Sequence, residues 1–190
     1  FLTLTVSICC TLGRCAMYRK TITLFNYHAE TDSWYTTVFI GADLIENSGT
    51  NATRQGQTNS DTVDLLIHVR RDKKADTVIY KPKRIADAEG NIIVSGEDSF
   101  IVYGDPDLHL DKQYVGPKAY AAIENPRNYF TFTPESDFFI VGNYYSQEPV
   151  DDAEFEDGLY SAMNAAHDGV YMVSSVAFYS LIPHFEIGGR

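Results

Sequence analysis

Residues 20–40 carry the clearest alternation of apolar and polar side chains in the chain. In Lys20–Tyr27, Ile22 and Leu24 fall on one face and the threonines between them fall on the other. A period of two is typical of a β-strand with one buried face. Trp34–Ile40 repeats the pattern, and the six residues between the two runs, His28–Ser33, are polar and turn-like. The stretch therefore predicts a β-hairpin with a slightly long loop.

Further strands are predicted along the rest of the chain. Residues 43–46 either extend the second strand or begin a third. In 61–69, Val63, Leu65 and Ile67 alternate with their neighbours and predict the next strand, which a charged turn at 70–76 follows. Runs rich in β-branched and aromatic residues predict the remaining strands at 77–80, 91–94, 99–103, 129–133, 138–142, 170–182 and 184–187.

Helical patterns are few. Pro82–Ala88 and the segment that begins at Pro117 each predict one or two turns, because proline is favoured in the first turn of a helix. Gln147–Asp168 predicts the one long helix, which Gly158 weakens and Gly169 ends. Its apolar positions form a single stripe, made by Phe155, Leu159, Ala162, Met163 and Ala166. We expect this stripe to pack on the sheet, and a partner-binding face is the alternative.

These elements predict a mainly β fold, an antiparallel meander or small barrel with one C-terminal helix and one or two short helical turns. An aromatic content of 13% agrees with a strand-rich domain. Residues 17–190 suit one domain that is large enough to fold without a disulfide or a metal. Segments 80–104 and 114–142 share an order of Pro-Lys, helical turn, strand, acidic turn and Phe-Ile-Val strand. Internal duplication and chance both explain that likeness.

The first 16 residues differ in character from the rest of the chain. They are interpreted as a disordered leader or as upstream sequence translated in frame before Met17, with the remnant of a secretory signal as the main rival. A short strand is a third interpretation, because Leu2, Leu4, Val6 and Ile8 alternate with polar residues. All three cysteines, at positions 9, 10 and 15, fall in this segment, so the predicted domain has no disulfide.

Residues 47–60 form a polar segment that we expect to be a mobile loop. It contains no apolar residue larger than Ala52 and can bury almost nothing. Asn51-Ala52-Thr53 fits a glycosylation acceptor pattern, which chance explains as well. A long polar loop in a compact domain is often functional. The residues that we predict to contact a partner are Asn47, Thr50, Asn51, Arg54 and Gln57.

A net charge of −11 argues against nucleic acid and anionic lipid as partners, because both are bound through an excess of Lys and Arg. The five histidines show no metal-ligand spacing, and the chain contains neither a Gly-x-Ser-x-Gly elbow nor a glycine-rich phosphate loop. Asp105, Asp107 and Asp111 alternate like ligands of a hard cation, but the pattern lacks the central Gly and terminal Glu of a calcium loop. We therefore predict no catalytic residue, no cofactor and no metal.

Four landmarks resemble a family of small proteins encoded by prophages and tailed phages of Gram-positive gut bacteria. The opening 19–27 is similar to the start of that family, with Met17 as initiator, and Trp34-Tyr35-x-Thr37-Val38 follows. The third landmark joins Tyr114-x-x-Pro117-Lys118 to Tyr129-x-Thr131-x-x-Pro134 and 137–142. The chain closes on 183–190, near the family's terminal His-x-x-Val-Gly-Gly-Lys pattern.

This resemblance implies a virion structural or assembly protein, similar in role to minor capsid or head–tail joining proteins. It implies a non-catalytic module that forms a homo-oligomeric ring and contacts portal, capsid or tail proteins, in the virion and in the host cytoplasm during assembly. Two alternatives stay open. One is a secreted or surface glycan-binding module that uses exposed tyrosines such as Tyr144 and Tyr145, and the other is a hydrolase with a carboxylate pair in a cleft.

Overall fold

The computed structural model describes the backbone of residues 19–47, 50–53, 56–59, 62–81, 84–86, 92–95, 100–103 and 111–190. Side chains are described for residues 20–46, 62–81 and 111–190. The predictions made for the first 16 residues, and the choice of Met17 as initiator, lie outside these ranges.

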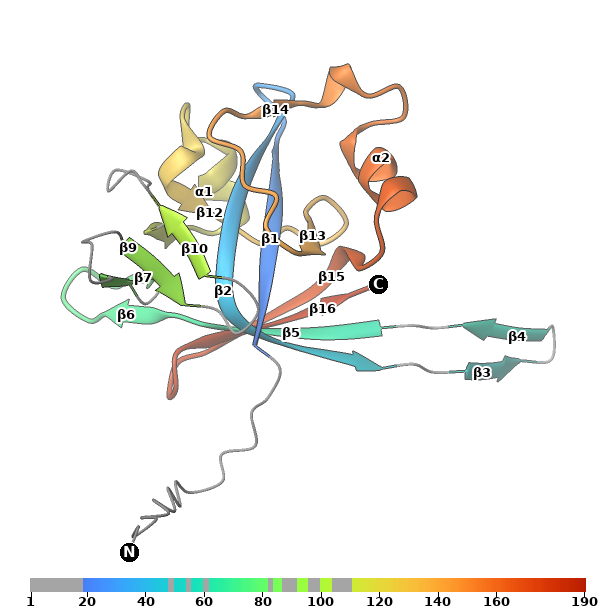
Figure 1. The fold of residues 1–190 in the computed structure, drawn as a ribbon, viewed down its shortest axis with the longest axis horizontal. Coiled ribbons are helices and arrows are strands. Elements are labelled where there is room, and N and C mark those ends of the chain that lie inside the picture. Colours follow the sequence, from blue (N-terminus) through green and yellow to red (C-terminus); the bar gives the residue numbers. More distant parts are fainter. Residues whose placement is uncertain are drawn as a thin grey trace, which may run out of the picture.

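Six antiparallel strands form a closed barrel (Figure 1). They pair in the order β1-β13-β15-β16-β5-β2, and a direct pairing of β1 with β2 closes the ring. Their bounds are Arg19–His28 for β1, Ser33–Asn47 for β2, Thr62–His68 for β5, Phe138–Val141 for β13, Val170–Tyr179 for β15 and His184–Gly189 for β16. The predicted mainly β fold, with a small barrel as one of its two forms, is confirmed.

The first hairpin also matches its prediction closely. His28 pairs with Ser33, so the loop between β1 and β2 is shorter than the six residues predicted. Residues 43–46 extend β2, which was one of the two predicted possibilities. At Gly41, which has a φ of 77°, one residue bulges out of the ladder between β1 and β2. Glycine tolerates this left-handed conformation, and the bulge bends the strand β2 at this point.

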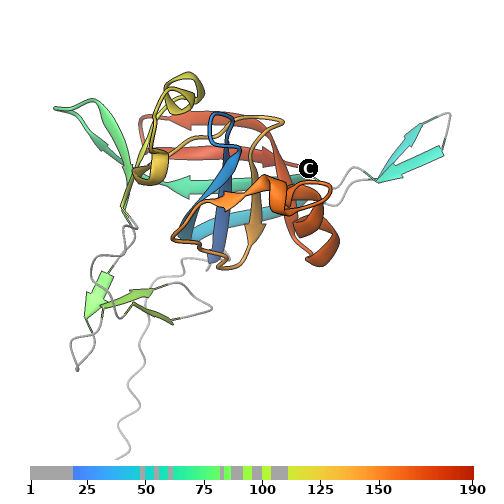
Figure 2. The ribbon, with the colours of Figure 1, turned by 90° about the horizontal axis from the view of Figure 1, so that it is seen from above.

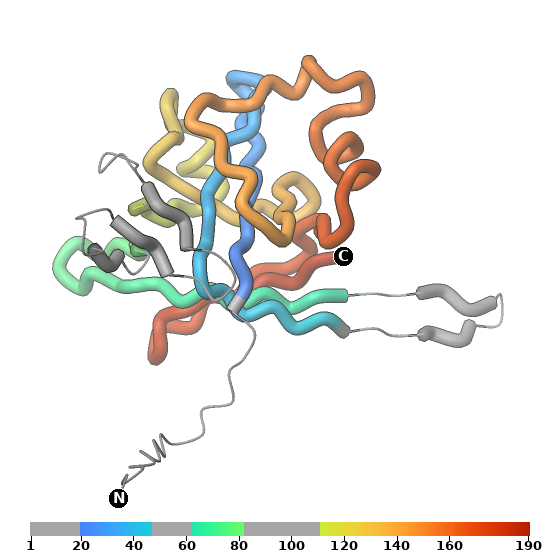
Figure 3. Tube along the Cα trace, in the orientation of Figure 1, coloured from blue at the N-terminus to red at the C-terminus, as the bar shows by residue number. Residues whose placement is uncertain are grey.

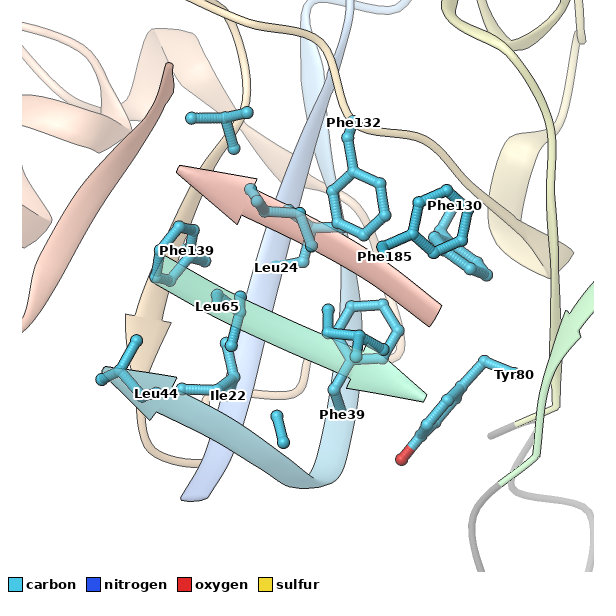
Figure 4. Packing of buried hydrophobic residues seen from close by; sticks show 14 of the residues in the cluster. Ile22, Leu24, Phe39, Leu44, Leu65, Tyr80, Phe130, Phe132, Phe139 and Phe185 are labelled. Carbon is cyan, nitrogen blue, oxygen red and sulfur yellow. The ribbon is translucent and has the colours of Figure 1, made fainter. Parts of the chain in front are cut away.

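The barrel interior is filled by aromatic and branched side chains (Figure 4). The alternation in β1 points Ile22 and Leu24 inward, where both are buried. Phe130 and Phe132 enter from the segment before β13, and their ring centroids lie 5.3 and 6.2 Å from that of Phe39. Each large side chain removed from water in this way stabilises the fold by about 1.5–3 kcal/mol.

A second apolar cluster covers the outside of the barrel. Phe25 stacks on Phe138 at a centroid distance of 4.6 Å, and both contact the helix α2, Leu159–Ala166, through the buried Leu159. The predicted packing of the helical stripe on the sheet is thus confirmed for Leu159. Partly buried Phe155 and Met163 join the same cluster, whereas Ala166 is exposed.

The prediction of one helix over 147–168 is wrong for its first half. That half holds the short strand β14, Val150–Asp151, and the 3-10 turn η2, Asp152–Glu154. Gly158 adopts a φ of 80°, which interrupts the helical backbone, and Asp152 Oδ1 accepts the first amide of α2, that of Leu159, over 2.8 Å. Gly158 is therefore the boundary of the helix, and Asp152 caps the new start.

A four-stranded sheet lies against one side of the barrel. Its order is β12-β11-β7-β6, with bounds Tyr129–Phe130, Lys112–Tyr114, Thr77–Tyr80 and Arg70–Asp72. It covers a part of β2 that pairs with β1 along one edge but has no described strand along the other, since that edge pairs with β14 at Trp34 and with β5 only from Asp43. Tyr80 Oη accepts from the Ile40 amide over 2.6 Å, and Lys112 Nζ donates to a β2 carbonyl over 2.6 Å. Side chains thus satisfy backbone groups that a missing strand leaves unpaired.

Two short helices complete this side of the molecule. The predicted turn beginning at Pro117 is confirmed as α1, Pro117–Ala121, and η1, Pro126–Asn128, follows it. The strand predicted over 129–133 is confirmed only for β12. Residues 70–72, predicted as a turn, pair instead with β7 as β6.

The remaining strands form two small sheets. β9, Ile92–Ser95, pairs with β10, Phe100–Tyr103, which confirms the predicted hairpin. β8, Arg84–Ala86, also pairs with β9, so the helical turn predicted for 82–88 is wrong there, because the β-branched Ile85 lies opposite Ile93. β3, Thr50–Thr53, pairs with β4, Gly56–Asn59, so part of the predicted polar loop is a hairpin.

The two segments that look alike in sequence fold differently. The segment 84–86 is a strand, whereas its counterpart after Pro117 is α1. The first Phe-Ile-Val run belongs to a three-stranded sheet and the second to the barrel. The described parts therefore favour shared turn chemistry over duplication as the origin of the likeness.

Candidate functional site

The residues predicted to contact a partner lie in the connection between β2 and β5. Asn47 ends β2 opposite Thr62, so this connection leaves from the end of two paired strands. The backbones of Thr50, Asn51 and Gln57 belong to the β3–β4 hairpin, and Arg54 lies outside the described residues. The side chains of all five lie outside the described ranges, so their contact role stays a prediction.

Of the three acidic residues considered as metal ligands, the structure describes Asp111 alone. Asp105 and Asp107 lie outside the described residues. Asp111 has a carboxylate oxygen 3.6 Å from Lys81 Nζ, which makes it one half of an ion pair. Within the described ranges, no group of three or more His, Cys, Asp and Glu side chains is placed to hold a metal ion.

The turn between β15 and β16 carries the most exposed apolar side chains of the described residues. Leu181 is 95% exposed and Ile182 is 67% exposed. We call residues 179–183 the apolar tip. Its hairpin is fixed in place, because Phe185 of β16 is buried in the barrel and the Tyr179 ring stacks on His184 at 4.8 Å. The tip therefore presents apolar surface to water from a rigid base, and such surface marks interaction sites.

A cluster of positive charge lies beside the apolar tip. The β6–β7 hairpin, residues 70–77, which we call the basic hairpin, exposes two arginines and two lysines, Arg70, Arg71, Lys73 and Lys74. The amide of Val69 donates to the Pro183 carbonyl over 3.1 Å, which ties the start of this hairpin to the tip. Both turns lie at the left of the barrel in Figure 3.

The strongest negative charge lies elsewhere on the barrel. Residues 148–157, which we call the acidic strap, lead to α2 and contain six carboxylates but neither Lys nor Arg. Five of the carboxylates belong to exposed residues, Glu148, Asp151, Glu154, Glu156 and Asp157, and Glu148 forms an ion pair with Arg127. Val150 pairs with Trp34 of β2, and Asp152 accepts the indole N–H of Trp34 over 2.6 Å, which holds the strap on the barrel.

A buried polar network closes the barrel at the ends of β1 and β13. Asp137 is fully buried, and its carboxylate accepts from Asn26 Nδ2 over 2.8 Å, from the Thr133 amide over 2.6 Å and from the Tyr27 amide over 3.1 Å. Burial raises the pKa of Asp137 to about 7, although these three donors lower it. Burial also raises the pKa of the Tyr120 hydroxyl.

The same end of the barrel holds polar atoms without a hydrogen-bond partner among the described residues, including His28 Nε2 and Tyr120 Oη. The two rings meet edge to face at 5.9 Å, and both residues are buried. No residue of this network is exposed. Its hydrogen bonds and ring contacts hold the β1–β2 turn, residues 131–133 and α1 together.

No family model matches this chain. Searches of curated proteins and of solved structures give no match either. No helix among the described residues is long and apolar enough to cross a membrane.

The described surfaces also bear on the two alternative functions. Tyr144 and Tyr145 are both half-buried, and the Tyr144 hydroxyl lies 3.3 Å from His167 Nδ1, so this pair offers no fully exposed ring. Two cavities are lined by described residues. One, of about 140 Å³, lies beside Tyr80 and has no carboxylate in its lining. The other, of about 410 Å³, has a single carboxylate, that of Glu46, so neither offers a carboxylate pair.

Sequence reasoning missed the apolar tip because 170–182 has the pattern of one continuous strand. The available signal was the apolar pair Leu181-Ile182 directly before Pro183, where the strand must end. The basic hairpin was visible as a charged turn, but a net charge of −11 gives no sign that positive charge gathers there.

Proposed function

We propose that this chain is a non-catalytic assembly module of a phage particle, with a role like that of minor capsid or head–tail joining proteins. The observation that supports the proposal is the apolar tip, where Leu181 and Ile182 stand exposed on a hairpin anchored in the barrel. Exposing apolar surface to water is unfavourable, and an exposed apolar patch is typical of a site that another protein covers. The sequence resemblance gives the setting in which that partner occurs.

The proposal is tested in particles made by the host that carries this gene. We expect the chain in purified particles at a fixed ratio to the other virion proteins, measured by mass spectrometry. Its absence from the particles would refute the proposal.

A pair of variants assigns the incorporation to the tip. The double variant Leu181→Ser and Ile182→Ser should fold, because both side chains lie outside the core, and should be lost from particles. Ile45→Ser is the matched control, since Ile45 is a 43% exposed apolar residue of β2 paired opposite Asp64. Equal incorporation of the tip variant and the control would show that the tip is not the contact.

A further inference from the structure

We propose that the apolar tip and basic hairpin of one copy bind the acidic strap of a second copy, so that copies associate head to tail. This inference rests on the proposed function and names the partner of the apolar tip. It is carried by the separation of charge on the barrel and by the apolar surface at its positive end.

The positive end combines charge with apolar area. Lys73 and Lys74 are exposed and have no ion pair with a described residue. Of the two acids in the basic hairpin, Asp76 pairs with Arg71 over 2.7 Å, and Asp72 Oδ1 accepts the Lys74 amide over 2.8 Å. The basic hairpin therefore presents two ammonium groups, and its start at Val69 is hydrogen-bonded to Pro183 of the apolar tip, so that charge and apolar area occur on two neighbouring turns.

The negative end offers the complement. Glu154, Glu156 and Asp157 are exposed, and none of them pairs with a Lys or Arg of the described residues. The half-buried Phe155 lies among them and supplies an apolar contact. The strap is also fixed, because Asp152 binds both Trp34 and the start of α2. A preformed surface loses little conformational entropy on binding.

The two ends lie on opposite sides of the barrel. Seen from above, the basic hairpin and α2, which follows the acidic strap, project in different directions (Figure 2). One copy therefore cannot join its own two ends, and two copies cannot satisfy both contacts in a two-fold dimer. A contact between two different surfaces is heterologous, and it produces a ring where the rotation closes.

A second copy fits the positive end better than another anionic surface does. A net charge of −11 repels nucleic acid, anionic lipid and a second copy alike at long range, so the choice among them depends on the short-range contact. A second copy brings its carboxylates to the tip in a fixed arrangement with an aromatic ring among them.

Reciprocal charge reversal tests the contact. One variant carries Lys73→Glu and Lys74→Glu, and the other carries Glu154→Lys and Glu156→Lys. Sedimentation velocity over a dilution series should show association of the wild type that weakens as ionic strength rises from about 0.1 M, where long-range repulsion is already screened, to about 1 M. Each variant alone should associate at least roughly tenfold more weakly, because its own two ends repel. An equimolar mixture should recover the association, since each variant restores the complement of the other.

Lys118→Glu on α1 is the control, because it reverses an exposed charge away from both ends and should associate like the wild type. A wild type that stays monomeric throughout, or a mixture that stays dissociated, would overturn the inference. Binding of the monomer to anionic vesicles through Lys73 and Lys74 would overturn it too and assign the positive end to lipid. A chain present in particles but monomeric in solution would refute only this inference, and one that self-associates but is absent from particles would refute only the proposed function.

Discussion

Asp137 allows a direct test of how the barrel end balances burial against hydrogen bonding. Its carboxylate is fully buried and accepts three hydrogen bonds, and burial raises its pKa from 3.8 to about 7. The unfolded chain releases this proton near pH 3.8, whereas the folded chain keeps it until about pH 7. In that window the folded state binds more protons. The contribution of Asp137 to stability is therefore greatest below pH 3.8 and is lost as the pH rises through 7.

The size of this effect is set by the pKa shift. One pH unit corresponds to about 1.4 kcal/mol, so the two units between pH 5 and the folded pKa of about 7 amount to about 3 kcal/mol. Asp137→Asn has the same shape and no charge, so it lacks this dependence. The side-chain amide of the variant also places an N–H opposite one of the three donors. This unpaired donor costs about 1–3 kcal/mol of stability at every pH. We therefore expect the stability difference between wild type and variant to shrink by about 3 kcal/mol from pH 5 to pH 8.

Urea denaturation of both proteins at pH 5, 6, 7 and 8 measures this difference. Asp157→Asn is the matched control, because that carboxylate is exposed and should show no such trend. A difference for Asp137→Asn that is constant from pH 5 to pH 8 would refute the reasoning. It would mean that the three donors outweigh burial and that the carboxylate stays ionised throughout.

Three further substitutions test other parts of the fold by denaturation. Burial lowers the pKa of Lys112 from 10.5 to about 8, so wild-type stability from this group should rise with pH between 8 and 10.5. Lys112→Met should remove that rise, and a rise that persists in the variant would contradict the assignment. Asp152→Ala should cost about 2–3 kcal/mol and shift the emission of Trp34, the single tryptophan, because the indole N–H loses its acceptor; an unchanged spectrum would contradict this contact. Gly189→Ala should cost about 1–3 kcal/mol, since its Cβ would lie 2.7 Å from a valine methyl inside the barrel, whereas Gly116→Ala has nothing within 4 Å and should be neutral; equal costs would refute the packing argument.

The sequence predicts the barrel strands well because their alternation is set by the barrel itself. Ile22 and Leu24 must face inward wherever a strand of this pattern closes a core, and the β1–β2 hairpin follows from residues that are close in the chain. The irregular segment before α2 could not be predicted in this way. Phe155 and Leu159 fall at helical spacing, but the backbone between them is broken at Gly158 because Asp152 is held by Trp34, a residue more than 100 positions away. A contact of that sequence separation leaves no local pattern.

The candidate site was harder to predict than the fold because it depends on neighbours in space. Val69 meets Pro183 only because β5 pairs with β16, and this pairing sets the start of the basic hairpin next to the apolar tip. In the sequence, 70–76 is a charged turn and 170–182 is the end of a strand, and each is ordinary alone. Net charge adds the two ends of the molecule together, so a value of −11 conceals a positive end. Local charge, and not its sum, decides which surface a partner meets, because screening limits such contacts to about 10 Å at moderate salt. A chain that repels anionic surfaces at long range can therefore still bind carboxylates at short range, provided that its partner presents them in a fixed arrangement.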